Sequence, residues 1–188
     1  MLNAARTEFA SIGYHGASMR VIAEKAGLST RTLYNYYPDK SALFEACIEM
    51  SSIEIDHQIL IEGSDLHSRL LSFATQMQVQ MAHEENLQIT RLIFRESMSL
   101  PELIAIARIQ FYRYQVEPVR RILEEGGIPF DRSESLAAIY VGMTYTRWQQ
   151  CVIFNDPPMT RAEIENYSKQ ITDLFLRGAI KSNCEIAT

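Results

Sequence analysis

The sequence has little of what marks secreted, zinc-binding or membrane-spanning proteins. Its three cysteines, Cys47, Cys151 and Cys184, are far apart and form no CxxC pair. This spacing argues against a disulfide framework or a zinc site, and a reducing cytoplasm suits it best. No apolar run approaches the roughly 20 residues that a membrane span needs, and no signal-peptide pattern opens the chain. We therefore expect a cytoplasmic protein with no membrane partner.

Catalytic and strand-forming patterns are also scarce. The segment His83-Glu84-Glu85-Asn86 lacks the second histidine of a zinc-protease helix, and the four histidines share no metal-ligand spacing. We find no Ser-His-Asp arrangement and no glycine-rich phosphate loop. Apolar residues recur at helical rather than alternating period, without repeats. The sequence thus predicts an all-α fold of about nine helices, with no enzymatic activity, metal or cofactor.

The net charge of −5 divides unevenly along the chain. Residues 1–50 carry five basic and five acidic side chains, so the acidity belongs to residues 51–188. Residues 18–40 carry four basic against two acidic side chains. A DNA-binding surface there would be locally positive but weakly charged. Its affinity for DNA should be modest and strongly salt-dependent, since phosphate contacts release counterions.

Residues 18–40 contain two short helical patterns that meet at Gly27. Ser18 is a candidate N-cap for the first, and Gly27 permits the left-handed turn that ends it. Ser29 or Thr30 can cap the second pattern, which Pro38 ends. Two helices joined by a short glycine-bearing turn form a helix-turn-helix, whose second helix fits the DNA major groove.

The side chains of this motif suit two kinds of DNA contact. The side chains that can reach base edges or phosphates are those of Arg20, Arg31, Thr32 and Asn35, and arginine can clamp guanine with two hydrogen bonds. Hydroxyl and lysine side chains better suit phosphates, which fix register without reading sequence. To that group we assign Ser29, Thr30, Tyr34, Tyr36 and Lys40, and Ser18 is expected at the same surface.

The N-terminal 45 residues resemble the TetR family of transcriptional regulators. The matching residues are Gly13-Tyr14, Ser18, Ile22-Ala23, Ala26-Gly27, Leu28-Ser29, Leu33-Tyr34, Tyr36-Tyr37, Lys40 and Leu43. The resemblance implies that Ser29 to Thr32, Tyr34 to Tyr36 and Lys40 contact DNA. The chain differs in having Tyr37 where the family has Phe. The sequence begins within the first helix, so the basic arm of many relatives either precedes Met1 or is missing. The C-terminal part is similar to AefR-type regulators, through Asp131 and the segment Asp173-Leu174-Phe175-Leu176.

Helical patterns continue beyond the motif. Asp39 can cap a helix that reaches towards Leu60, and a helix from Pro101 to about Glu125 should kink or split at Pro118. Asp131-Arg132-Ser133-Glu134 and Thr160-Arg161-Ala162-Glu163 are two expected capping boxes. We expect a DNA-binding domain at residues 1–45 and a domain for effector binding and dimerisation at residues 46–188.

Aromatic and methionine side chains recur along the second domain. Such a stripe is more often plain core, but it includes polar groups, namely Arg95, Gln110, Arg147 and several tyrosine hydroxyls. A mostly apolar lining with a few polar groups is typical of small-molecule sites. The residues assigned to an effector site are Met77, Met81, Phe94, Arg95, Met98, Phe111, Tyr114, Tyr140, Met143, Arg147 and Trp148. The expected effector is small and apolar or amphipathic, and an aromatic ring or one acidic group would suit it.

The last two helical patterns have broad apolar faces, which the resemblance implies are paired with a second copy. The residues assigned to this dimer interface are Leu136, Ile139, Phe154, Ile164, Tyr167, Ile171, Leu174 and Phe175. The sequence therefore predicts a homodimeric repressor that an effector releases from a palindromic operator. A helical dimer whose head no longer binds DNA is the alternative left open.

Overall fold

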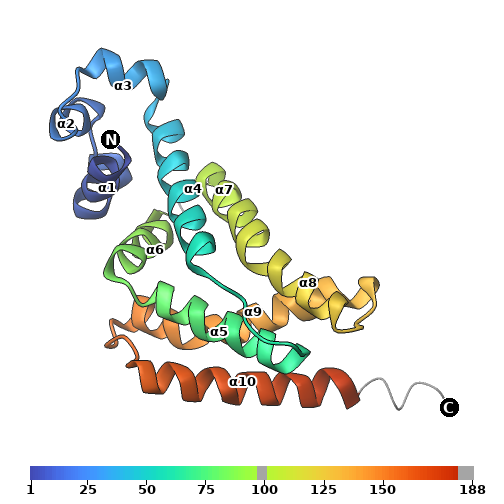
Figure 1. Ribbon diagram of the computed structural model, residues 1–188. Coiled ribbons are helices and arrows are strands. Elements are labelled where there is room, and N and C mark those ends of the chain that lie inside the picture. Colours follow the sequence, from blue (N-terminus) through green and yellow to red (C-terminus); the bar gives the residue numbers. More distant parts are fainter. Residues whose placement is uncertain (97–100, 182–188) are drawn as a thin grey trace. The chain divides into compact units, whose positions relative to one another are not determined.

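The computed structural model describes residues 1–96 and 101–181, and every regular element among them is a helix, as the sequence predicts (Figure 1). Side chains at 53–58, 85, 102, 103 and 179–181 lie outside this description. The elements are α1 (Leu2–Gly16), α2 (Met19–Lys25), α3 (Thr30–Tyr36), α4 (Lys40–Gln58), α5 (Leu66–Met81), α6 (Glu84–Glu96), α7 (Pro101–Phe111), η1 (Tyr112–Val116), α8 (Glu117–Glu125), α9 (Phe130–Phe154) and α10 (Arg161–Lys181).

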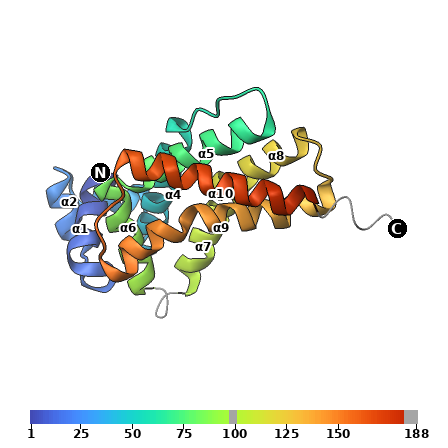
Figure 2. The same cartoon turned by 90° about the horizontal axis from the view of Figure 1, so that it is seen from below.

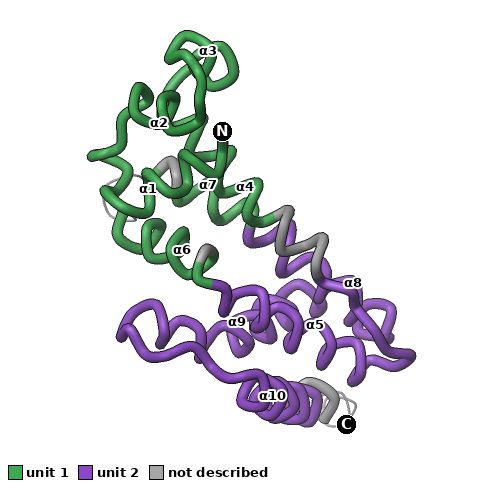
Figure 3. Tube along the Cα trace, turned by 60° about the vertical axis from the view of Figure 1, so that its left-hand side comes forward, with its two compact units in different colours: residues 1–54, 84–110 green, residues 55–83, 111–188 purple. Residues whose placement is uncertain are grey.

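The chain forms two compact units, coloured separately in Figure 3. Unit 1 contains residues 1–54 and 84–110, and unit 2 contains residues 55–83 and 111–188. Unit 1 is thus built from two separate segments, and α4 runs from one unit into the other. The boundary expected at residue 45 divides the chain by function, whereas these two units divide it by compactness. That boundary stays a prediction. None of the described helices is long and apolar enough to cross a membrane.

The core of unit 1 joins the first three helices to the start of α4 and to α6. Phe9 and Phe44 pack edge to face with ring centroids 5.0 Å apart, and Ile89 and Leu92 of α6 belong to the same buried cluster. Cys47 is also in this core, where burial raises the pKa of its thiol to about 12. The thiol therefore stays protonated at neutral pH and packs as a small apolar group.

The core of unit 2 contains a chain of buried polar side chains between α5, α9 and α10, which pack against one another (Figures 1 and 2). The Tyr140 hydroxyl donates to the carbonyl of Leu70 and lies 2.7 Å from the Thr172 hydroxyl. Gln78 Nε2 donates to the Ser168 hydroxyl at 2.7 Å. Buried polar groups need such partners, and their geometry fixes which helix faces meet.

Pro118 interrupts the long helix predicted over residues 101–125, as expected. The five residues before α8 form a π-helical turn, η1, in which the Glu117 amide donates to the carbonyl of Tyr112, five residues back. Pro118 lies in the first turn of α8, where its missing amide costs least. If α7, η1 and α8 count as one interrupted helix, the described elements number nine.

The two expected capping boxes have different outcomes. The amide of Thr160 donates to the Glu163 carboxylate and the amide of Glu163 donates to the Thr160 hydroxyl, so that box is confirmed. The box at Asp131 is wrong, because α9 starts earlier, with Pro129 as its N-cap and Asp131 inside the first turn. Pro129, whose ring restricts its φ, lies at the N-cap position two residues before Asp131. Asp131 is therefore already inside the helix and does not act as its cap.

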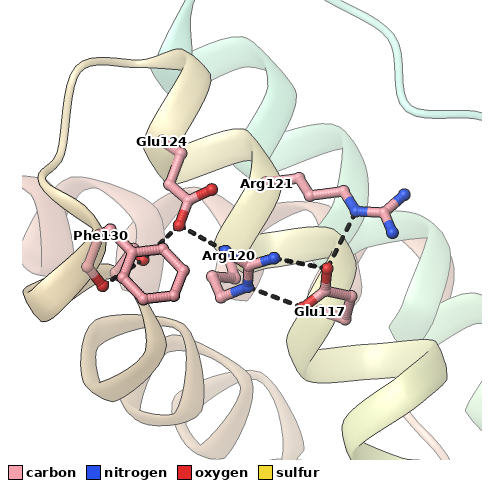
Figure 4. A network of polar contacts seen from close by, with 6 residues as sticks. Glu117, Arg120, Arg121, Glu124 and Phe130 are labelled. Atoms are coloured by element: carbon pink, nitrogen blue, oxygen red, sulfur yellow. Dashed lines mark hydrogen bonds and ion pairs between the residues drawn. The ribbon is translucent and has the colours of Figure 1, made fainter.

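A network of charges joins α8 to the start of α9 (Figure 4). Arg120 donates to the carboxylates of Glu117 and Glu124, and the Ser133 hydroxyl donates to Glu124. The hydrogen bonds from Arg120 hold the pKa of the Glu117 carboxyl down to about 2. Glu117 therefore stays ionised at neutral pH. Arg120 also lies over the ring of Phe130, with its Cζ 5.4 Å from the ring centre.

Gly13 ends the regular part of α1 in a backbone conformation that only glycine adopts readily. Its φ and ψ are 82° and 169°, and a Cβ there would lie 2.8 Å from Arg95 Nη2 and 3.1 Å from Glu96 Oε1. Gly27 also has positive φ, 69°, but a Cβ on it would have no neighbour within 4 Å.

We expect Gly13→Ala to lower the free energy of unfolding by about 3 kcal/mol, because strain and crowding add. Gly27→Ala should cost only about 1 kcal/mol for the left-handed backbone. Urea unfolding of both variants measures the difference, and equal losses would contradict the crowding at Gly13.

Candidate nucleic-acid interface

The turn between α2 and α3 is a complete Schellman motif. The amide of Leu28 donates to the carbonyl of Ala23, and the amide of Gly27 donates to the carbonyl of Glu24. These two bonds satisfy the last carbonyls of α2, and they require the left-handed conformation that Gly27 supplies. The predicted end of the first helix of the motif is confirmed.

The start of α3 is fixed by Ser29, one of the two predicted caps. Its hydroxyl accepts from the amide of Thr32 at 3.0 Å and lies 2.8 Å from the Thr32 hydroxyl. Ser18 occupies the N-cap position of α2 with extended backbone, but its hydroxyl makes no capping hydrogen bond. The expectation that the Ser18 hydroxyl holds an orphan amide is therefore wrong.

One face of α3 is exposed and carries the side chains assigned to DNA. Leu33 is fully buried, whereas Arg31, Tyr34 and Asn35, which share a face by their spacing, are exposed. Tyr36 is 67% exposed, and Thr30 and Thr32 are half-buried. Within the described residues Arg31 makes no ion pair, so its guanidinium is available to an external anion.

Arg20 and Lys40 have partners within the protein. Arg20 lies 3.7 Å from Glu24 in an exposed pair, which is worth little in water. Lys40 Nζ donates to the carbonyls of His15 and Ala17 at 3.2 and 3.0 Å, and lies 4.7 Å from the centre of the Tyr14 ring. Lys40 thus fastens the segment between α1 and α2 to the start of α4.

Glu96 of α6 also contacts this segment. Its carboxylate accepts from the amide of Tyr14 at 3.3 Å and lies 3.8 Å from His15 Nε2. The sequence analysis missed Glu96, because nothing in a linear pattern links residue 96 to residue 14. Its near-complete burial, at 8% exposure, was equally invisible in the sequence.

The residues assigned to effector binding are divided between the units. Phe94 and Arg95 belong to unit 1 and are exposed, and Met98 lies outside the described residues. In unit 2, Met77, Met81, Tyr140 and Trp148 are buried, Phe111, Tyr114 and Met143 are half-buried, and Arg147 is exposed. Tyr140 lies in the polar core described above. The assignment of these residues to an effector stays a prediction.

Three of them contact Tyr145, and a fourth contacts Trp148. The Tyr145 ring lies 5.9 Å from that of Phe111 and 5.2 Å from that of Trp148, and its hydroxyl donates to Met77 Sδ at 3.5 Å. The Trp148 indole donates to the carbonyl of Met81 at 3.0 Å. We call Phe111, Tyr145, Trp148, Met77 and Met81 the aromatic cluster.

The residues assigned to the dimer interface differ in exposure. Ile164, Ile171 and Phe175 are buried inside unit 2, and Leu136 and Tyr167 are half-buried. Ile139, Phe154 and Leu174 are 52%, 70% and 66% exposed. The sequence analysis missed Ile153, at 58% exposure, although its helical spacing from Ile139 is a usable signal. This interface also stays a prediction.

These features define the class of the head. Unit 1 carries two short helices locked by a glycine turn, the second of which presents basic, aromatic and amide side chains, and this is the architecture of a helix-turn-helix DNA-binding domain. This head is similar to that of the TetR family. Its residues 1–47 match the family model described as "Bacterial regulatory proteins, tetR family".

Known relatives and structures are consistent with this family. The regulator UidR of Escherichia coli K12 is 27% identical over 119 residues, covering 56% of this chain and 61% of UidR, so the chain spans about three fifths of that relative. The flavonoid-responsive regulator FrrA has a TM-score of 0.79 at 24% identity, covering 94% of this chain and 93% of FrrA. FadR of Bacillus subtilis, solved with stearoyl-CoA, has a TM-score of 0.76 at 18% identity, covering 94% and 96%.

Lys40→Met keeps the aliphatic stem but removes the ammonium group from the carbonyls of His15 and Ala17. We expect it to lower the free energy of unfolding by about 1–2 kcal/mol, the cost of lost hydrogen bonds to a charged group. Arg31→Met, which breaks no internal contact of the described residues, should leave stability unchanged. Urea unfolding that gives equal stability for the two variants would mean that Lys40 does not hold this segment.

Proposed function

We propose that this protein is a transcriptional regulator that binds double-stranded DNA through α3. The observation that carries the proposal is the exposed face of Arg31, Tyr34 and Asn35, presented by a helix whose two ends are fixed by Gly27 and Ser29. Arginine and asparagine can read guanine and adenine edges in the major groove. Tyr34, Tyr36 and the hydroxyls at the start of α3 suit the flanking phosphates.

A second copy of the chain completes the DNA-binding unit in this proposal. One recognition helix reads few bases, and a twofold dimer places two of them about 34–36 Å apart on a palindromic operator. An exposed stripe along α9 supports such a dimer, because its members follow a spacing of three and four residues: Ile139, Gly142, Thr146, Gln149 and Ile153. A Cβ on Gly142 would have no neighbour within 4 Å, so a partner helix could approach closely.

In this proposal a small apolar or amphipathic effector releases the protein from DNA. The protein is then a repressor that occupies its operator when no effector is bound. Two observations support the assignment: the aromatic cluster in unit 2, and the names of the structural neighbours FrrA and FadR, one flavonoid-responsive and one solved with stearoyl-CoA. The effector must prefer the form with low DNA affinity, and an almost complete switch needs about 5.5 kcal/mol of preference.

DNA binding should depend on Arg31 and Tyr34 together. We expect Arg31→Ala with Tyr34→Ala to weaken binding to a palindrome from the neighbouring promoter at least tenfold, since one arginine–guanine pair alone is worth about 1–3 kcal/mol. Fluorescence anisotropy at two salt concentrations measures the affinity, with a scrambled duplex as reference. Arg161→Ala, an exposed arginine of α10, is the control and should bind like the unmodified protein.

If the unmodified protein binds both duplexes weakly and equally, the helical dimer with an idle head replaces this proposal. If the double variant binds as tightly as the unmodified protein, the DNA surface lies elsewhere.

The oligomeric state should depend on the α9 stripe. Ile139→Asp replaces an apolar side chain of this interface by a charge and should convert the dimer into monomers at micromolar concentration. Leu60→Asp is the matched control, because Leu60 is 68% exposed and lies outside α9 and α10. Light scattering after size exclusion measures the mass. A dimer that survives Ile139→Asp unchanged would move the interface away from this stripe.

A further inference from the structure

Two charged side chains from different helices hold the segment that joins α1 to α2. The amide of Tyr14 donates to the carboxylate of Glu96, the last residue of α6. The carbonyls of His15 and Ala17 accept from the ammonium group of Lys40, the first residue of α4. One short segment is therefore held through its amide by α6 and through its carbonyls by α4.

The contact between Glu96 and this segment is close and buried. Glu96 is buried where α6 packs against α1, and a Cβ on Gly13 would lie 3.1 Å from its carboxylate oxygen. Glycine at position 13 thus leaves room for the charged end of α6. A buried carboxylate is costly unless it accepts hydrogen bonds, so the bond from the Tyr14 amide stabilises both groups.

The ammonium group of Lys40 points to the protein itself. Two of its three hydrogens go to the carbonyls of His15 and Ala17, and the centre of the Tyr14 ring lies 4.7 Å from Nζ. A lysine whose donors are used inside the protein has little left for a DNA phosphate. Its charge instead meets carbonyls at the end of α1, where the helix dipole is negative.

The segment leads directly into the DNA-binding helices. Ala17 is followed by Ser18 at the N-cap position of α2, and the Schellman turn joins α2 to α3 through two backbone hydrogen bonds. α2 and α3 also pack against each other. The direction in which the segment leaves α1 therefore sets the direction of the face formed by Arg31, Tyr34 and Asn35.

We propose that Glu96 and Lys40 are positioning residues for DNA binding, which hold α3 in its DNA-binding orientation without touching DNA. The inference rests on the proposed function and adds residues on which its DNA contacts depend. Glu96 is informative, because its charge has the wrong sign for a phosphate contact. If only long-range electrostatics mattered, a neutral side chain at position 96 would strengthen DNA binding. A positioning role predicts the opposite, weaker binding.

Two neutral variants of Glu96 separate the hydrogen bond from the charge. Glu96→Leu has no acceptor, and we expect it to weaken operator binding about tenfold, the factor that one hydrogen bond to a charged group supplies. Glu96→Gln keeps an oxygen for the Tyr14 amide and should weaken binding by no more than about threefold, since a neutral acceptor is weaker than a carboxylate. Glu84→Leu removes the same charge at the exposed start of α6 and should bind like the unmodified protein. Fluorescence anisotropy measures each affinity, below the melting temperature of every variant.

The salt dependence of binding separates a phosphate contact from a positioning role for Lys40. Each lost phosphate contact reduces the slope of log affinity against log salt by about 0.9. We expect Lys40→Met to weaken binding about tenfold while the slope stays unchanged. The double variant with Glu96→Leu should lose much less than the product of the two single losses, because either loss alone already frees the segment.

Amide hydrogen exchange, followed by mass spectrometry, gives a readout that needs no DNA. Residues 14–28 should exchange faster in Glu96→Leu than in Glu84→Leu. Operator binding by Glu96→Leu as tight as that of the unmodified protein would overturn the role of Glu96. A slope reduced by about 0.9 in Lys40→Met would overturn that of Lys40. If the unmodified protein binds no operator, the proposed function itself fails, and equal exchange in the two glutamate variants would then also refute the hold on the segment.

Discussion

The DNA-binding head depends on how the chain leaves α1. Gly13 turns the backbone in a conformation that other residues rarely adopt, and two side chains from distant elements then hold the segment that follows. Glu96 accepts from the amide of Tyr14, and Lys40 donates to the carbonyls of His15 and Ala17. The segment leads directly into α2. The place of the helix-turn-helix within unit 1 is therefore set by a glutamate and a lysine that are far apart in sequence.

Local chemistry made much of the head predictable. Gly27 ends α2, Ser29 caps α3 and Asp39 accepts from the amide of Ala42 at the start of α4, as the sequence indicated. In each case the group that needs a partner and the group that supplies it lie within five residues. The exposed face of α3 follows as well, since Leu33 fixes which side is buried.

What the sequence left open depends on neighbours that only the fold supplies. A lysine at position 40 predicts a phosphate contact, yet its ammonium group donates hydrogen bonds to two backbone carbonyls of its own chain. Ile164, Ile171 and Phe175 have the same apolar character as Ile139 and Leu174, but α5 and α9 cover the first three.

The two-segment make-up of unit 1 has a consequence for the order in which the protein is made. Ile89 and Leu92, which belong to the core of the helix-turn-helix, are synthesised only after residues 55–83 of the other unit. On the ribosome, the DNA-binding helices must therefore wait for α6 before their core is complete. A nascent chain that carries only the family motif would still expose the apolar side chains that α6 later covers.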